Sequence, residues 1–182
     1  MKRITIVVAC LLLITAAVDA QQHETQSKTP PQKPSRDATR EKLRALLDTA
    51  GPKMNVSFRQ SEKQPYNFVG ILSQGLKNSD SLEIVILVSE QDTIHFRIYP
   101  RYKGSYVNID RVAGSAGLMR QMLRFSDTNF LYWGADSSGD IFAGYNFTLE
   151  SGFPEAAIGV VLNSIANLDQ YVGQMKPALD GS

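Results

Sequence analysis

The stretch "SLEIVILVSEQDTIHFRIY", residues 81–99, decides the fold because it encodes two strands joined by a short turn. Apolar residues stand at every second position in each half, and "EQD" at 90–92 separates the halves. Successive side chains of a strand point to opposite faces of the sheet. The pattern therefore predicts an antiparallel pair with one buried face. The residues expected on the other face of the second strand are Thr93, His95, Arg97 and Tyr99.

A cationic and aromatic stretch, "FRIYPRYKGSYV" at 96–107, overlaps the second strand. Proline has no N–H for a strand ladder, so Pro100 is predicted to end the strand and residues 101–104 to form a connection. Two interpretations remain open: a solvated strand face with its loop, or a patch that contacts an acidic or aromatic partner. Under the second interpretation the partner-binding residues are His95, Arg97, Tyr99, Arg101, Tyr102 and Lys103.

Three elements are predicted before this pair. Apolar residues recur at helical spacing from Leu43 to Ala50, and "GP" at 51–52 stops the run, which indicates a helix. Alternation at 54–58 and the apolar "YNFVGIL" at 66–72 each predict a strand.

The C-terminal half predicts a helix, a hairpin and a final helix. The second helix is expected over 109–125, with Asn108 or Asp110 as its cap. Its Gly114 and Gly117 either weaken the helix or mark close packing against a sheet or another subunit. The hairpin is "NFLYWGADSSGDIFAGYNFTL", and its turn "DSSGD" matches a calcium loop poorly, which favours simple turn chemistry. The final helix follows "GFPE" and is predicted to end at Pro177.

These elements give an α+β fold in the order α-β-β-β-β-α-β-β-α. We expect an antiparallel sheet of about five to six strands with three helices packed on it. Residues 37–179 are predicted to form this single domain.

The N-terminal residues are predicted to direct export. A basic start leads into "ITIVVACLLLITAAV", and small residues at Val18 and Ala20 suit cleavage after Ala20, so residues 1–20 read as a signal peptide. Residues 21–36 are polar and rich in proline, which is typical of a disordered leader. We therefore expect a periplasmic or secreted protein with no stable membrane insertion after cleavage.

Charge and cysteine content exclude several function classes. The chain has 19 basic and 18 acidic residues. Lys2, Arg3 and Asp19 belong to the predicted signal peptide, so the mature chain is neutral, and nonspecific nucleic-acid binding, which depends on excess positive charge, is not expected. The only cysteine is Cys10, so the mature chain has neither a disulfide nor a thiol nucleophile.

Catalytic and metal-binding patterns are weak. His95 is the only histidine of the predicted domain, no "GxxxxGK[ST]" phosphate loop occurs, and no ligand cluster has metal spacing. The sequence therefore favours a protein that is not an enzyme and holds no cofactor or metal. The alternatives are a small-ligand carrier or hydrolase-type enzyme with a pocket near His95, and a structural envelope protein.

Three segments carry a resemblance to a known family: "LMRQMLRF" at 118–125, the hairpin that follows it, and "AAIGVVLNSIANLDQYV" at 156–172. Together with the order of elements they resemble the YbjN family of bacterial sensory-transduction regulators, which is similar in fold to type III secretion chaperones. The resemblance implies a non-catalytic domain that binds another protein or protein segment, and possible homodimers.

Overall fold

The computed structural model of the chain describes residues 35–127 and 130–181. The helices are α1 (Arg36–Ala50), α2 (Ser115–Asp127), α3 (Glu155–Ser164) and α4 (Asp169–Leu179), with 3-10 turns η1 (Pro52–Met54), η2 (Ile109–Arg111) and η3 (Ile165–Leu168). The strands are β1 (Arg59–Gln60), β2 (Asn67–Leu72), β3 (Ser81–Val88), β4 (Thr93–Tyr102), β5 (Ser105–Tyr106), β6 (Tyr132–Ala135) and β7 (Ile141–Thr148).

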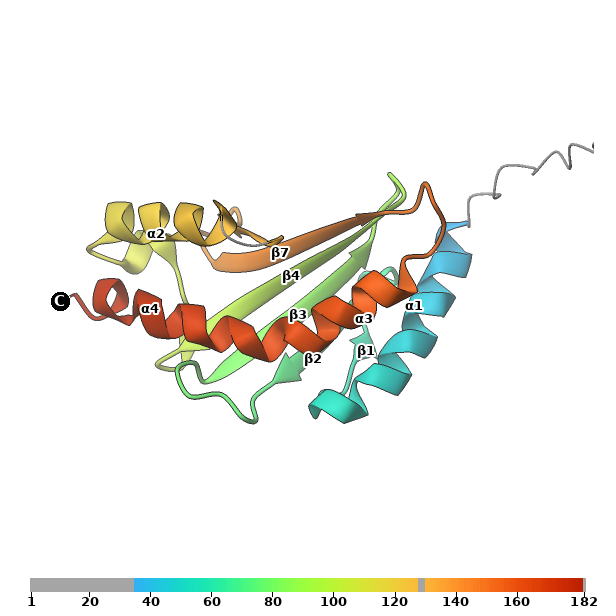
Figure 1. The fold of residues 1–182 in the computed structure, drawn as a ribbon, viewed down its shortest axis with the longest axis horizontal. Coiled ribbons are helices and arrows are strands. Elements are labelled where there is room, and N and C mark those ends of the chain that lie inside the picture. The colour runs from blue at the N-terminus through green and yellow to red at the C-terminus, as the bar shows by residue number, and fades with distance from the viewer. Residues whose placement is uncertain (1–34, 128–129, 182) are drawn as a thin grey trace, which may run out of the picture. The chain divides into compact units, whose positions relative to one another are not determined.

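The strands form one sheet in the order β1-β2-β3-β4-β7-β6, in which every pairing is antiparallel and β5 pairs with the end of β4 (Figure 1). The predicted α+β class with an antiparallel sheet and helices is confirmed. The sheet has seven strands, two of which, β1 and β5, are only two residues long.

The opening hairpin forms the centre of the sheet, as predicted. Ile84 lies opposite Ile98 and Ile86 opposite Phe96, and all four side chains are fully buried. Burying one large apolar side chain contributes about 1.5–3 kcal/mol. The pairing of β3 with β4 is therefore fixed, because a slip by one residue would turn both apolar rows to the other face.

The helices cover one face of this sheet. Figure 1 shows α3 and α4 in line along the sheet, and α1 contacts α3 and β3 while α2 contacts α4 and β6. Leu43 and Leu47 from α1, Leu118 from α2 and Ile158 from α3 join the buried side chains of the central strands in one core. The opposite face carries no helix in the described residues.

The strand predicted at 54–58 is wrong. The chain forms η1 there, Asn55 adopts a left-handed φ of 54°, and β1 begins only at Arg59. The Val56 N–H donates to the Gly51 carbonyl at 2.9 Å, which folds the segment back on the end of α1. Val56 is nevertheless buried. The apolar alternation at this position therefore reflects burial of a side chain and not pairing with a neighbouring strand.

The prediction that Pro100 ends its strand is also wrong, because β4 continues to Tyr102. The Val107 N–H donates to the Pro100 carbonyl at 3.1 Å, so an N–H at residue 100 would point to the Val107 carbonyl. That carbonyl accepts from the Ile141 N–H at 2.9 Å instead. The proline therefore leaves no partner unsatisfied.

The second helix begins later than predicted. Residues 109–111 form η2, capped by the Asn108 side chain as expected, and α2 starts at Ser115. Gly114 thus precedes the helix, and a methyl group on Gly117 would meet no atom within 4 Å. Close packing of Gly117 inside the described chain is therefore excluded.

The predicted final helix is divided into α3, η3 and α4, and Pro177 lies inside α4 instead of ending it. A proline ring costs a helix the hydrogen bond of its own nitrogen. Because α4 ends two residues later, at Leu179, only its last turn is affected.

A buried carboxylate joins the start of α4 to the connection between β2 and β3. Asp169 is 7% exposed and accepts hydrogen bonds from the backbone N–H groups of Lys77, Asn78 and Ser79 at 2.8–3.0 Å. The Ser79 hydroxyl donates a further bond at 2.6 Å. Burial alone raises the pKa of Asp169, but these hydrogen bonds outweigh it and hold the pKa below its ordinary value.

Candidate functional site

The face of the sheet opposite the helices, here called the open face, carries the candidate site. Its central side chains come from alternate positions on five strands. They are Val69 and Ile71 of β2, Glu83, Val85 and Leu87 of β3, His95, Arg97, Tyr99 and Arg101 of β4, Phe142, Gly144 and Asn146 of β7, and Tyr132 and Gly134 of β6.

Four aromatic rings form a row across this face. Tyr106, which lies opposite Arg101 on β5, is 6.0 Å from Tyr99 between ring centroids. Tyr99 is 5.5 Å from Phe142, and Phe142 is 6.0 Å from Tyr132. These separations are those of stabilising aromatic pairs. The row (Tyr106, Tyr99, Phe142 and Tyr132) therefore runs without a break over β5, β4, β7 and β6; Tyr132 is exposed, Tyr99 and Tyr106 are half-buried, and Phe142 is buried among its neighbours.

Two glycines allow the rings to lie across the strands. A Cβ atom on Gly144 would stand 2.4 Å from the Tyr132 ring, and one on Gly134 would stand 3.2 Å from the Phe142 ring. Each glycine lies opposite the strand position that carries the ring, since Tyr132 pairs with Gly144 and Gly134 with Phe142. The absence of a side chain at these positions is what brings the rings close to the backbone.

Arginine guanidinium groups stack on the row. The Arg97 guanidinium carbon lies 4.8 Å from the centroid of the Phe142 ring, and that of Arg101 lies 5.2 Å from the Tyr106 ring. A cation over a ring face is attracted by about 0.5–1 kcal/mol at an exposed site. Arg101 also donates to the Gly104 carbonyl at 2.9 Å, whereas Arg97 is exposed to solvent.

His95 lies two residues before Arg97 on β4, opposite Asn146 of β7. Its Nδ1 is 2.8 Å from Oδ1 of Asn146, and because an amide oxygen only accepts, Nδ1 donates in this contact. The Tyr132 hydroxyl approaches the same oxygen at 3.4 Å. The imidazole is thereby oriented by β7, and its Nε2 is left for another partner.

Tyr106, at one end of the aromatic row, forms a strong hydrogen bond. The Tyr106 hydroxyl donates to the Glu83 carboxylate, and this bond, with burial and the negative charge of Glu83, raises the pKa of Tyr106 to about 12. For Tyr99, burial is the main cause of a raised pKa, which Arg97 partly offsets and Asp136 reinforces. Both hydroxyls are therefore neutral donors at physiological pH.

We expect titration of the phenolate absorbance to show one tyrosine that ionises near pH 12 and disappears in Tyr106→Phe. Glu83→Gln should lower that pKa toward its ordinary value of 10, because the acceptor loses its charge. Since the folded pKa is the higher one, the bond stabilises the fold fully below pH 10, and its contribution is lost as the pH rises through 12. Glu62→Gln, at an exposed position, is the control; an unchanged titration in Glu83→Gln would contradict the assignment.

A shallow pocket of about 350 Å³ opens on this face beside Arg97. Val85 and Leu87 supply its apolar lining, Arg97 supplies a cationic group and His95 an imidazole ring. Tyr99, Gln64 and Asn67 complete the lining. The pocket thus offers an apolar floor with polar groups at its edge, the usual composition of a small binding site. It is called the Arg97 pocket below.

The structure brings together four of the six predicted partner-binding residues. His95, Arg97, Tyr99 and Arg101 lie in one row on the open face. Tyr102 packs against the core under the helices, and its hydroxyl donates to Asp180 at 3.1 Å.

Lys103 also lies away from the row, at the turn after β4, and pairs with Asp180 at 2.7 Å. The hydrogen bond from Lys103 is the main cause that lowers the pKa of Asp180. Tyr102 and Lys103 therefore fasten the end of α4 and take no part in the open face.

Sequence reasoning missed the β6 and β7 part of the site. Trp133 of β6 and Phe142 of β7 lie on opposite faces of the sheet. Trp133 packs under the helices against Phe125 and Tyr171, and Phe142 lies on the open face. The alternation in 141–148 was the available signal, since Phe142, Gly144 and Asn146 occupy every second position.

The hairpin turn confirms the simpler of its two interpretations. Oδ1 of Asp136 accepts from the N–H groups of Ser138 and Asp140 at 2.9 and 3.1 Å, which is turn chemistry. Among residues 35–127 and 130–181 no three His, Cys, Asp or Glu side chains lie close enough to hold a metal ion. Within the same residues no helix is long and apolar enough to cross a membrane.

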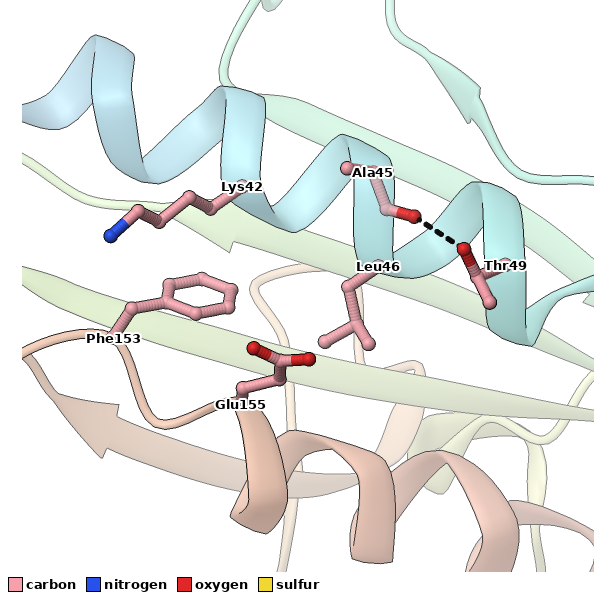
Figure 2. Close-up of a pocket in the computed structure, with 6 residues that line it drawn as sticks. All are labelled: Lys42, Ala45, Leu46, Thr49, Phe153 and Glu155. Atoms are coloured by element: carbon pink, nitrogen blue, oxygen red, sulfur yellow. Dashed lines mark hydrogen bonds between the residues drawn. The ribbon is translucent and has the colours of Figure 1, made fainter.

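A second cavity, of about 490 Å³, lies between α1 and the start of α3. Figure 2 shows Lys42 and Leu46 of α1 facing Phe153 and Glu155 across it. The hydrogen bond drawn there, from the Thr49 hydroxyl to the Ala45 carbonyl at 3.0 Å, lies within α1. This cavity combines one cation and one anion without an aromatic row, so the open face is the stronger candidate.

Fold and site together define an α+β domain that has helices on one face of its sheet and an aromatic, cationic surface on the other. Comparisons of the chain with models of protein families, with curated proteins and with solved structures find no match. The resemblance to the YbjN family therefore stays a prediction.

Proposed function

We propose that this chain is an exported, non-catalytic domain that binds a segment of another protein on the open face of its sheet. The observation that carries the proposal is the aromatic row with Arg97 stacked on it, on a face that no helix covers in the described residues. Tyrosine and arginine are the residues most enriched in the energetic centres of protein interfaces. The row crosses four strands, so it can contact several residues of an extended segment.

A small-ligand carrier is the second candidate, and the Arg97 pocket is the observation that favours it. An enzyme of hydrolase type would need a nucleophile within hydrogen-bond reach of His95. The group found at Nδ1 of His95 is instead the Asn146 amide oxygen, which cannot attack a substrate. Binding therefore accounts for the open face better than catalysis does.

Arg97→Glu is the variant that tests the proposed function. The chain from Gln21 onward is crosslinked in the cell envelope of its source, beside Arg97→Glu and the matched control Arg120→Glu on α2, which is exposed on the helical side. We expect a partner to be captured by the native chain and by Arg120→Glu, and its yield to fall at least about tenfold for Arg97→Glu, since like charges then face the partner.

The crosslink should also map to the open face, and hydrogen exchange with that partner should protect β4 and β7. A partner held equally by all three proteins, with protection confined to the helices, would overturn the proposal. Equal melting temperatures of the two variants are required before the comparison is made, because Arg97 and Arg120 are both exposed and neither change should disturb the core.

A further inference from the structure

Charge on the open face is unbalanced. Arg97 and Arg101 of β4 lie on it, and Arg59 of β1 is paired opposite an open-face position of β2. The acids beside this face are Glu83 of β3, which already accepts a hydrogen bond from Tyr106, and Asp136, which adjoins Tyr99 and accepts from the N–H groups of the hairpin turn. In the part of the chain that the structure describes, neither Arg97 nor Arg101 forms an ion pair. The face is therefore complementary to a negatively charged partner.

The geometry of Arg97 suits a carboxylate. Its strand neighbour on β7 is Gly144, which has no side chain of its own, and the guanidinium carbon lies 4.8 Å from the centroid of the Phe142 ring. Stacking on a ring uses the flat side of a guanidinium and leaves its N–H edge for hydrogen bonds, to the neighbouring Tyr99 hydroxyl and to a ligand. A carboxylate can accept two parallel bonds from that edge, an arrangement stronger than a bond between neutral groups.

The surroundings of the Arg97 pocket limit the charge of the anion. Val85 and Leu87 form an apolar floor that favours a group with few charges. Asp136 lies near enough to Tyr99 to raise the pKa of that phenol, and Glu83 stands farther along β3. These two acids would repel a multiply charged phosphate group more than a single carboxylate.

We infer that the open face recognises an acidic protein segment, in which one aspartate or glutamate side chain enters the Arg97 pocket and its carboxylate binds the Arg97 guanidinium. This inference rests on the proposed function and names the chemistry of its partner. The segment's neighbouring residues then lie along the aromatic row, which continues past the pocket to the exposed ring of Tyr132. An internal side chain is specified, because the surface extends on both sides of the pocket and a chain end would leave half of it bare.

Three synthetic peptides test the inference: acetyl-SAYEVS-amide, the same peptide with glutamine for glutamate, and the glutamine peptide with a free C-terminus. Their dissociation constants are measured by NMR at low ionic strength, with the chain from Gln21 onward, Arg97→Gln and the matched control Arg120→Gln. We expect the glutamate peptide to bind the native chain about tenfold more tightly than the amidated glutamine peptide. The preference should vanish in Arg97→Gln and persist in Arg120→Gln.

The amide resonances of His95, Arg97 and Tyr99 should shift on binding, and added salt should weaken only the glutamate peptide. Equal affinity of all peptides with shifts on the open face would overturn the carboxylate inference and leave the proposed function standing. If the peptide with the free C-terminus bound more tightly than the glutamate peptide, the inference that the carboxylate belongs to an internal side chain would be overturned. If no resonance shifted at peptide concentrations up to about 10 mM, the affinity would be below that of a weak ligand and the inference would also be overturned. The proposed function is tested separately by the crosslinking experiment.

Discussion

Asp169→Ala is expected to lower the free energy of unfolding by about 4 kcal/mol, a large part of the stability of a domain of this size. The substitution leaves three backbone N–H groups, at residues 77, 78 and 79, without the acceptor they share. It also removes the acceptor of the Ser79 hydroxyl. Denaturant titration followed by circular dichroism measures the change.

Asp180→Ala is the matched control, because Asp180 is also an aspartate of the C-terminal region but pairs with surface groups, Lys103 and Tyr102. Exposed ion pairs contribute little, so a much smaller loss of stability is expected there than for Asp169→Ala. If the two variants lost equal stability, the hydrogen bonds of Asp169 would contribute no more to the free energy of unfolding than the surface contacts of Asp180.

Acid should reveal the same carboxylate. The folded pKa of Asp169 lies below its ordinary value of 3.8, so its contribution to stability is complete above that pH and is lost as the pH falls through the folded pKa. The stability difference between the native chain and Asp169→Asn should therefore be constant near neutral pH and shrink below about pH 4. A difference that grows on acidification would contradict this sign.

Gly51→Ala is expected to destabilise the fold by about 3 kcal/mol, the upper part of the range for overpacking. A Cβ atom on Gly51 would stand 2.4 Å from the Val56 carbonyl oxygen and 2.9 Å from that of Leu47. Both atoms belong to the backbone, so relief requires the turn after α1 to open. The same turn holds the hydrogen bond from Val56 N–H to the Gly51 carbonyl, which that movement would break.

Gly117→Ala supplies a control with the opposite sign. It lies in α2 with open space around the added methyl group, and alanine favours a helix over glycine by about 1 kcal/mol. The melting temperature should rise for Gly117→Ala and fall for Gly51→Ala. Two shifts of the same direction would mean that close backbone contact at Gly51 does not control the outcome.

The central strands could be predicted from sequence because two requirements, burial and pairing with a similar strand, both produce the alternating pattern. Ile84, Ile86, Phe96 and Ile98 are buried, and each also pairs with a strand neighbour of the same kind. At 54–58 the alternating pattern has a buried residue but no neighbouring strand, since the hydrogen bond from Val56 N–H to the Gly51 carbonyl draws the segment away from the sheet. Alternation therefore predicts a strand reliably only where a neighbouring strand shares it.

The candidate site could be predicted in part. The positions of His95, Arg97 and Tyr99 on one face follow from the period of a single strand. The place of Phe142 beside them depends on which strand pairs with β4, and that is a property of the whole sheet.

The structural role of Asp169 could not be predicted from the sequence. It stands in a helical pattern, and its partners lie 90–92 residues away along the chain. A contact of this kind becomes visible only when the fold brings the connection between β2 and β3 against the start of α4.

The outermost strands of the sheet, β1 and β6, are two and four residues long. A sheet edge grows by adding a strand from another molecule, and its capacity to do so depends on the length of unpaired backbone that it exposes. Edges this short give an incoming chain few hydrogen bonds, and the parts of β2 and β7 that extend beyond them are short as well. We expect the folded protein to resist edge-to-edge aggregation at high concentration, even though the middle of its sheet carries apolar strands that would form fibrils readily if exposed.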